Sequence, residues 1–200
     1  MLNKFRNSLE PIISRLGLIF AAFGLSANFW TMLGLVTSIL AGAMYAMPAL
    51  TPTIRFHWFY ASISGSILLL ISGFFDIIDG SVARVTRQSS KKGAFLDSSL
   101  DKLAEAIIFI GIAAGSLADP LLCIIGLSLS LMVSYVRARA ESLNIELKGI
   151  GIGERAERLL IIAIMGLIPL VGIMQWAVIA VSVISGITLI QRITMTLKML

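Results

Sequence analysis

The sequence predicts an all-α membrane protein, with six transmembrane helices preceded by an N-terminal amphipathic helix at the membrane surface. Of its 200 residues, 58% are hydrophobic and only 14% are charged, which is too apolar for an ordinary soluble domain. The apolar residues also gather in runs long enough to cross a bilayer, which takes roughly 20 residues. We therefore expect two parts, an amphipathic helix over residues 1–25 and one integral domain over residues 26–200.

Charged and apolar side chains are mixed through the first 25 residues, and the apolar ones recur at helical intervals. This pattern is typical of a helix that lies in the membrane interface; a soluble helix packed on the protein is the alternative. Gly24 and Ser26 are expected to interrupt it, and Ser26 or Asn28 to cap the next helix. We expect no cleaved presequence, because no small-residue cleavage site follows an early apolar run.

Four hydrophobic spans are expected up to residue 139, at about Phe29–Met47, Trp58–Arg84, Gly93–Leu117 and Leu121–Arg139. Pro48 should end the first span, because proline cannot continue a helix without the loss of a hydrogen bond. Residues 49–56, with Pro52, should form the next loop, and Asp119 and Pro120 the turn after the third span. The second span exceeds the roughly 20 residues that a crossing needs, so its last turns should emerge from the hydrocarbon.

The last long hydrophobic stretch, Leu159–Ile190, contains no charged residue across 32 positions. A single helix of that length would measure about 48 Å, whereas the hydrocarbon core is roughly 30 Å thick. We therefore expect a division at residues 169–175. This gives a fifth and a sixth span after a polar, glycine-rich loop over residues 141–153, at about Glu154–Leu170 and Trp176–Leu197.

Lysine and arginine are distributed unevenly over the expected loops. With the N-terminus inside, the outer loops hold only Arg55 among these residues. The positive-inside rule then places both termini and the aspartates described below on the cytoplasmic side of the cell membrane. The net charge of +5 fits anionic lipid headgroups and a phosphate-bearing substrate better than nucleic acid, which we do not expect as a partner. The single cysteine, Cys123, offers neither a disulfide nor a zinc site.

The most informative stretch runs from Asp76 to Asp101 and places four aspartates at helical spacing. Asp76 and Asp79 project from the end of one expected helix and Asp97 and Asp101 from the start of the next, each pair on one face. A short polar link folds one pair towards the other. Four converged carboxylates repel one another unless a cation lies between them, and Mg²⁺, which takes oxygen ligands, is the natural candidate. Helix caps or ion-pair partners are the alternative roles.

This stretch closely resembles the signature of the CDP-alcohol phosphotransferase family. Besides the four aspartates, the match includes Gly80, Ala83, Arg84 and Gly93. In that family a CDP-linked alcohol donates its phosphoryl-alcohol group to an acceptor hydroxyl, and CMP leaves. The resemblance therefore implies an integral-membrane enzyme with a CDP-linked lipid as donor, membrane lipids around it, and a homodimeric assembly.

The resemblance also implies roles for individual residues. Asp76, Asp79, Asp97 and Asp101 would bind two divalent ions, Mg²⁺ or Mn²⁺, and Asp101 would also be the general base that takes the acceptor's proton. The donor nucleotide would lie against residues that are small or polar: Asn28, Thr31, Gly80, Arg84 and Ser90.

The physical chemistry of these donor-side residues suits a nucleotide to different degrees. Gly80 has no side chain and permits close approach, and Arg84 can pair with phosphate through its planar guanidinium. Snorkelling at the interface is the alternative for Arg84. Asn28, Thr31 and Ser90 fit ordinary helix-cap and loop roles nearly as well.

A second region, Ser134–Arg158, resembles the branch of the family that makes phosphatidylinositol phosphate or its archaeal ether-lipid counterpart. Arginines at cytoplasmic helix ends suit an acceptor that itself carries phosphate. We expect that phosphate to be bound by five of them: Arg137, Arg139, Arg155, Arg158 and Arg192. Inositol 1-phosphate is the favoured acceptor and glycerol 3-phosphate the second. The alternative is that nearby glutamates or lipid headgroups pair with these arginines.

An ion-coupled transporter that uses intramembrane aspartates is the alternative from another class. Such a protein would more naturally hold its carboxylates at mid-membrane, with inverted repeats and broken helices. Here the aspartates are expected at one face, beside phosphate-binding arginines, and this arrangement favours the enzyme.

Overall fold

The structure of the chain, a computed structural model, describes residues 2–50, 58–88, 90–147, 149–168 and 170–200, and only the backbone of residues 2–9. Within these ranges the chain forms seven helices and no strand, which confirms the all-α class. The helices are α1 (Leu2–Ala21), α2 (Ala27–Leu50), α3 (Trp58–Val85), α4 (Lys91–Ala114), α5 (Pro120–Ser142), α6 (Arg155–Gly166) and α7 (Ile173–Met199). The expected outer loop with Pro52 and Arg55, and Pro169 in the expected division, lie outside the described residues.

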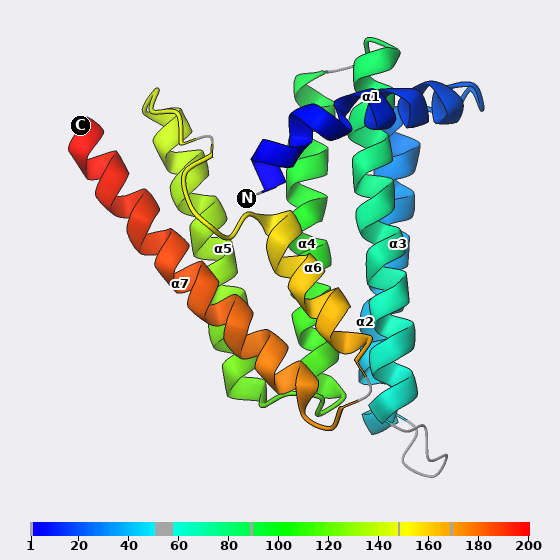
Figure 1. The fold of residues 1–200 in the computed structure, drawn as a ribbon, viewed down its shortest axis with the longest axis vertical. Helices are drawn as coiled ribbons and strands as arrows, with labels where there is room; N and C mark the ends of the chain where they lie inside the picture. The colour runs from blue at the N-terminus through cyan, green and yellow to red at the C-terminus, as the bar shows by residue number, and fades with distance from the viewer. Residues whose placement is uncertain (1, 51–57, 89, 148, 169) are drawn as a thin grey trace.

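Helices α2, α3, α4 and α5 run roughly along the long axis of the molecule, α7 is inclined to them, and α1 lies across one end (Figure 1). The segment after α5 turns back into the bundle before α6 begins (Figure 1). As a result Arg155, the first residue of α6, reaches Asp101, which lies well inside α4. This return of the chain is the feature that brings α6 to the aspartates.

Four helices are long and apolar enough to cross a membrane, namely α2, α3, α5 and α7, and they indicate a membrane protein. The expected second span agrees with α3 to within one residue. The first span does not end before Pro48, because α2 continues to Leu50. A proline in the last turn removes one hydrogen bond close to the point where the helix ends in any case. The fifth span is also shorter than expected: α6 ends at Gly166, and its 12 residues measure about 18 Å.

Helix α1 is attached to α3 by close backbone packing. The Ser81 hydroxyl donates to the Ile13 carbonyl at 2.7 Å, and Gly17 lies so close to Ser81 that a side chain would collide there. Large apolar side chains of α1 remain exposed, namely Ile12, Leu18 and Ile19, and Phe23 just after the helix is exposed as well. The helix is followed by Gly24, whose φ of 72° is left-handed, and Ser26 accepts from the Phe29 N–H at 3.3 Å to cap α2. Both interruption and cap lie where the sequence predicts them.

Small residues let α2 approach both α3 and α4 closely. Gly111 of α4 lies directly against the Gly42 backbone of α2, so a Cβ at Gly111 would collide with the Gly42 carbonyl. On the other side of α2, the Ser38 and Ser72 hydroxyls are 2.6 Å apart, and Ser72 donates to the Gly34 carbonyl at 2.9 Å. Ser72 lies one turn before Asp76 on α3, so these contacts fix the segment of α3 that carries the first aspartate.

Candidate active site

Three of the four aspartates come together between the second half of α3 and the first half of α4. Asp76, Asp97 and Asp101 each offer a carboxylate oxygen, and the three oxygens lie within 4.8 Å of one another. The turn between the helices produces this arrangement. Arg87 adopts a left-handed φ of 55°, the Gln88 N–H donates back to the Ala83 carbonyl at 3.0 Å, and Ser90 caps α4 through the Gly93 N–H.

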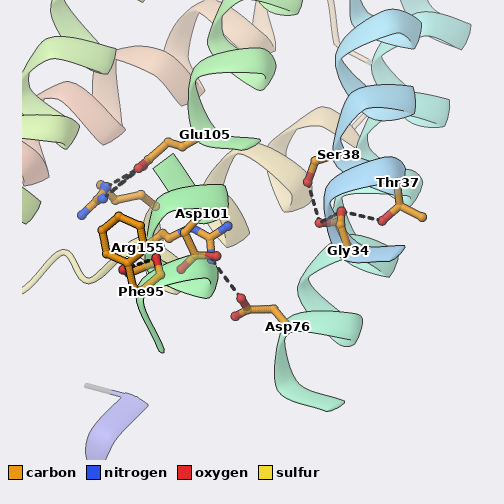
Figure 2. A network of polar contacts seen from close by, with 11 residues as sticks. Gly34, Thr37, Ser38, Asp76, Phe95, Asp101, Glu105 and Arg155 are labelled. Carbon is orange, nitrogen blue, oxygen red and sulfur yellow. Dashed lines mark hydrogen bonds and ion pairs between the residues drawn. The ribbon is translucent and has the colours of Figure 1, made fainter. Parts of the chain in front are cut away.

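Arg155 of α6 lies between two of these carboxylates (Figure 2). Its Nη1 is 3.1 Å from Asp76 and 2.6 Å from Asp101. Three partly buried carboxylates within a few ångströms repel one another, and one guanidinium offsets only part of that repulsion. The cluster therefore fits a hard divalent cation, which takes carboxylate oxygens as ligands.

Asp79 lies beside the cluster rather than in it, one turn beyond Asp76 on α3. This residue is only 6% exposed, and its Oδ2 has no hydrogen-bond partner among the described residues. A buried carboxylate oxygen without a partner is costly. This oxygen is therefore the feature of the site that most needs a cationic ligand.

A pocket of about 240 Å³ opens beside Asp79, between the start of α2, the end of α3 and the start of α4. Its lining includes all five residues expected to contact the donor nucleotide: Asn28, Thr31, Gly80, Arg84 and Ser90. A Cβ at Gly80 would meet only the tip of Arg84, at 3.5 Å, so this part of the helix surface is open to a ligand. Ser90 and Thr31 also serve the backbone, as a cap of α4 and as a donor to the Ala27 carbonyl. We call this space the donor pocket.

A larger cavity of about 660 Å³ lies on the other side of the aspartates, between α4, α5, α6 and α7. Four of the five expected acceptor arginines line it: Arg137, Arg155, Arg158 and Arg192. Arg139 does not line it; this side chain is exposed and contacts Ser142. We call this space the acceptor cavity. Asp97 lines both it and the donor pocket.

The arginines of the acceptor cavity are not equally free. All three guanidinium nitrogens of Arg158 are engaged, with Glu105 and with the Gly153 carbonyl. Arg192 donates from Nε to the Ile150 carbonyl and from Nη1 to the Val133 carbonyl, at 3.0 and 2.9 Å. Arg137 is partly exposed, and its Nε pairs with Glu141, one turn further on α5, at 2.9 Å. Arg137 and Arg155 are therefore the arginines best placed to meet a ligand.

Sequence reasoning missed several residues of the site. Lys102 lines the acceptor cavity beside Asp101, and Gln88 lines the donor pocket and accepts from the Ala27 N–H at 3.2 Å. Glu105 is the fully buried partner of Arg158. One signal was available for Glu105: it continues the Asp97–Asp101 spacing by one more turn, into an apolar helix where a carboxylate needs a partner.

Comparison with known proteins identifies the class to which this fold and site belong. The family model described as CDP-alcohol phosphatidyltransferase matches residues 20–188. The chain therefore belongs to the CDP-alcohol phosphotransferase family and is an enzyme of that type, a transferase of phospholipid biosynthesis, as the aspartate motif predicted. This assignment disfavours the transporter alternative.

Curated relatives point to one branch of the family. The chain is 41% identical to the archaetidylinositol phosphate synthase of Methanothermobacter thermautotrophicus, over 96% of this chain and 92% of that protein. It is 36% identical to the enzyme of the same name from Pyrococcus horikoshii, over 96% and 95%. It is 34% identical to the phosphatidylinositol phosphate synthase of Streptomyces avermitilis, over 96% and 81%.

Solved structures share the fold. The crystal structure of Mycobacterium tuberculosis phosphatidylinositol phosphate synthase with CDP-DAG bound superposes with a TM-score of 0.76 at 24% identity, over 93% of this chain and 94% of that one. A second crystal structure of that enzyme, in complex with manganese and citrate, gives a TM-score of 0.75 at 23% identity, over 92% and 88%.

Proposed function

We propose that this enzyme transfers a phosphatidyl or archaetidyl group from a CDP-linked lipid to a hydroxyl of inositol 1-phosphate and releases CMP. One observation carries the proposal: two spaces of different chemistry meet at the aspartates, and Asp97 lines both. The donor pocket, with Gly80 and Arg84, suits a nucleotide diphosphate. The acceptor cavity, lined by arginines, suits a second phosphate. The names of the relatives support the same pair of substrates.

The carboxylates of Asp76, Asp79, Asp97 and Asp101 would hold two divalent ions, Mg²⁺ or Mn²⁺. The convergence of three of them and the unpartnered oxygen of Asp79 support this assignment. When bound, such ions stabilise negative charge on both the attacking and the leaving oxygens of a phosphoryl transfer. A manganese-bound structure exists for the mycobacterial enzyme of the same fold.

Asp101 is the proposed general base. It belongs to the aspartate cluster and also lines the acceptor cavity, so an acceptor hydroxyl in that cavity lies within its reach. In the reaction, the acceptor oxygen forms a bond to the lipid-bearing phosphorus while the bond from that phosphorus to the CMP oxygen breaks. The hydroxyl proton passes to the Asp101 carboxylate. CMP leaves from the donor pocket.

The acceptor's phosphate is assigned to Arg137 and Arg155, with Arg192 contributing from the far wall of the cavity. A cluster of arginines matches an acceptor that carries a phosphate of its own, and unphosphorylated inositol or serine would not need it. Inositol 1-phosphate agrees with the names of the relatives. Glycerol 3-phosphate is the second acceptor to be tested.

The apolar helices and the distribution of positive charge indicate where the enzyme lies in the cell. We infer a multi-pass protein of the cell membrane in which α4 and α6 join the four apolar helices to make six, and in which α1 rests its exposed apolar face on the bilayer. Lysine and arginine are concentrated at the helix ends beside the aspartates, which supports a cytoplasmic site and cytoplasmic termini. Family resemblance supports a homodimer.

The experiment is a CMP-release assay on the purified protein in detergent. Radiolabelled inositol 1-phosphate, glycerol 3-phosphate, inositol and serine are offered in turn with a diacylglycerol-based or an archaeol-based CDP donor. The proposal expects CMP and labelled lipid with inositol 1-phosphate and background levels with inositol and serine. Turnover with an unphosphorylated acceptor, and none with inositol 1-phosphate, would refute the assignment of the arginine-lined cavity.

A further inference from the structure

A second ion pair lies directly behind the site, between the same two helices that carry Asp101 and Arg155. Glu105 of α4 is fully buried and Arg158 of α6 is 1% exposed. Arg158 donates to Glu105 from Nε at 3.2 Å and from Nη2 at 3.0 Å. Glu105 lies one turn beyond Asp101, and Arg158 one turn beyond Arg155. The two ion pairs thus join α4 to α6 at positions one helical turn apart. We call the Glu105–Arg158 pair the buried ion pair.

Hydrogen bonds at the buried ion pair connect four segments of the chain. The Ser130 hydroxyl of α5 donates to the same Glu105 carboxylate, and Arg158 Nη1 donates to the Gly153 carbonyl at 2.7 Å. Gly153 lies just before α6, in the segment that returns into the bundle. Its N–H in turn donates to the Thr188 hydroxyl of α7 at 3.0 Å. The start of α6, and with it Arg155, is therefore positioned through Glu105.

We propose that Glu105, held by Ser130, is a positioning residue that sets Arg155 at its distance from Asp101, and so sets the acceptor's phosphate relative to the base. Glu105 lines neither the donor pocket nor the acceptor cavity. The inference rests on the proposed function, because it takes Arg155 as the ligand of the acceptor's phosphate. It also assigns Arg158, which has no nitrogen free, to the support of the site rather than to the substrate.

Stability alone does not account for a buried ion pair in this place. Replacement of such a pair by apolar residues of similar volume is often neutral or stabilising, whereas loss of one partner leaves an uncompensated buried charge. A polar pair that only held α4 against α6 would be exchangeable for an apolar one. A pair that fixes the angle and height of α6 would not, because hydrogen bonds to Gly153 and Ser130 would be lost with it.

The test measures KM for both substrates in the full-length enzyme, in three variants. Glu105→Gln weakens the buried ion pair, and Ser130→Ala weakens its support more mildly. Glu105→Leu combined with Arg158→Met replaces the pair by an apolar contact. Mutation of a residue that orients a metal ligand typically costs about 10- to 100-fold in affinity or activity, and we take the same range for a residue that orients a substrate ligand. We expect the acceptor KM to rise by about that factor in Glu105→Gln and in the double variant, and less in Ser130→Ala. The donor KM should stay near the wild-type value, because no donor-pocket residue is touched.

Arg155→Ala supplies the readout that a merely structural role would not move. If Glu105 acts through Arg155, the two substitutions are not additive, and Glu105→Gln raises the acceptor KM no further in the Arg155→Ala background. Tyr45→Phe is the matched control, since it removes another fully buried hydrogen bond, to Ser66 at 2.9 Å. Ser66 lies about 15 Å from Asp76 along α3 at the helical rise, so Tyr45→Phe should leave both KM values unchanged.

Three results would overturn the inference: wild-type acceptor KM in the apolar double variant, equal rises for both substrates, or additivity with Arg155→Ala. Where Glu105→Gln does not fold, Ser130→Ala and the double variant decide the question. A failure of the proposed function is distinguishable, because the wild-type enzyme would then release no CMP with inositol 1-phosphate. The same comparison is then made with the acceptor that does react.

Discussion

Gly80→Ala separates the donor pocket from the stability of the helix that forms it. The new methyl group would meet only the end of Arg84, at 3.5 Å, which is an ordinary contact with a flexible side chain. Alanine in place of glycine inside a helix stabilises by about 0.5–1 kcal/mol, so the Tm should rise by about 1–4 °C. The fold therefore tolerates the change or gains from it.

Activity should respond in the opposite direction. The methyl group fills the surface of the donor pocket against which the nucleotide is proposed to lie, and a displacement of about 1 Å at a reacting group can cost on the order of 100-fold in rate. We expect kcat/KM for the CDP-linked lipid to fall about 10- to 100-fold, equivalent to about 1.4–2.8 kcal/mol. The measurement is CMP release at varied donor and saturating acceptor, beside a thermal melt of each variant.

Gly73→Ala is the matched control for this prediction. Gly73 lies two turns earlier on α3, and a Cβ there would meet nothing within 4 Å. It lies outside the lining of the donor pocket, so this variant should show the gain in Tm without the loss of activity. If Gly80→Ala keeps wild-type donor kinetics, as Gly73→Ala should, the nucleotide does not lie against this part of α3.

Four further predictions follow from the site and its scaffold. Asp101→Asn should lower kcat by about 10²- to 10⁴-fold while donor binding, measured by calorimetry, survives; a wild-type rate would remove Asp101 from the mechanism. Arg155→Ala should raise mainly the KM of the acceptor, and a rise in the donor KM instead would show that the two spaces are wrongly divided. Chelation by EDTA should abolish CMP release, which Mg²⁺ or Mn²⁺ restores; turnover that persists in EDTA would exclude a metal-dependent reaction. Gly111→Ala should destabilise by about 1–3 kcal/mol through the clash with Gly42, seen as a lower Tm, and an unchanged Tm would mean that α2 and α4 are not packed as described.

The sequence predicted most reliably those features that depend on neighbouring residues. The end of α3, the polar turn and the start of α4 follow from helical spacing and a serine cap, so Asp76, Asp97 and Asp101 could be placed together from the sequence. The helical spacing of the arginines also indicated which of them could share one face of α5. Arg137 and Arg139 are two residues apart on α5 and so point to different faces, and only Arg137 lines the acceptor cavity.

Features that depend on distant contacts were not predictable in the same way. The Glu105–Arg158 pair joins residues 53 positions apart. The position at which α6 begins depends on how residues 149–154 return into the bundle, which no local sequence pattern specifies. For the same reason the sequence assigned Arg158 to the substrate, whereas in the structure its nitrogens are taken up by Glu105 and Gly153.

The aspartates are proposed to hold divalent ions that bind a nucleotide-activated lipid, and anomalous diffraction from crystals grown with Mn²⁺ and CDP would locate those ions. We expect manganese peaks among Asp76, Asp79, Asp97 and Asp101, with the CDP diphosphate beside them and the nucleotide against Gly80. Manganese peaks only elsewhere in the molecule, at a Mn²⁺ concentration that supports full activity, would contradict it.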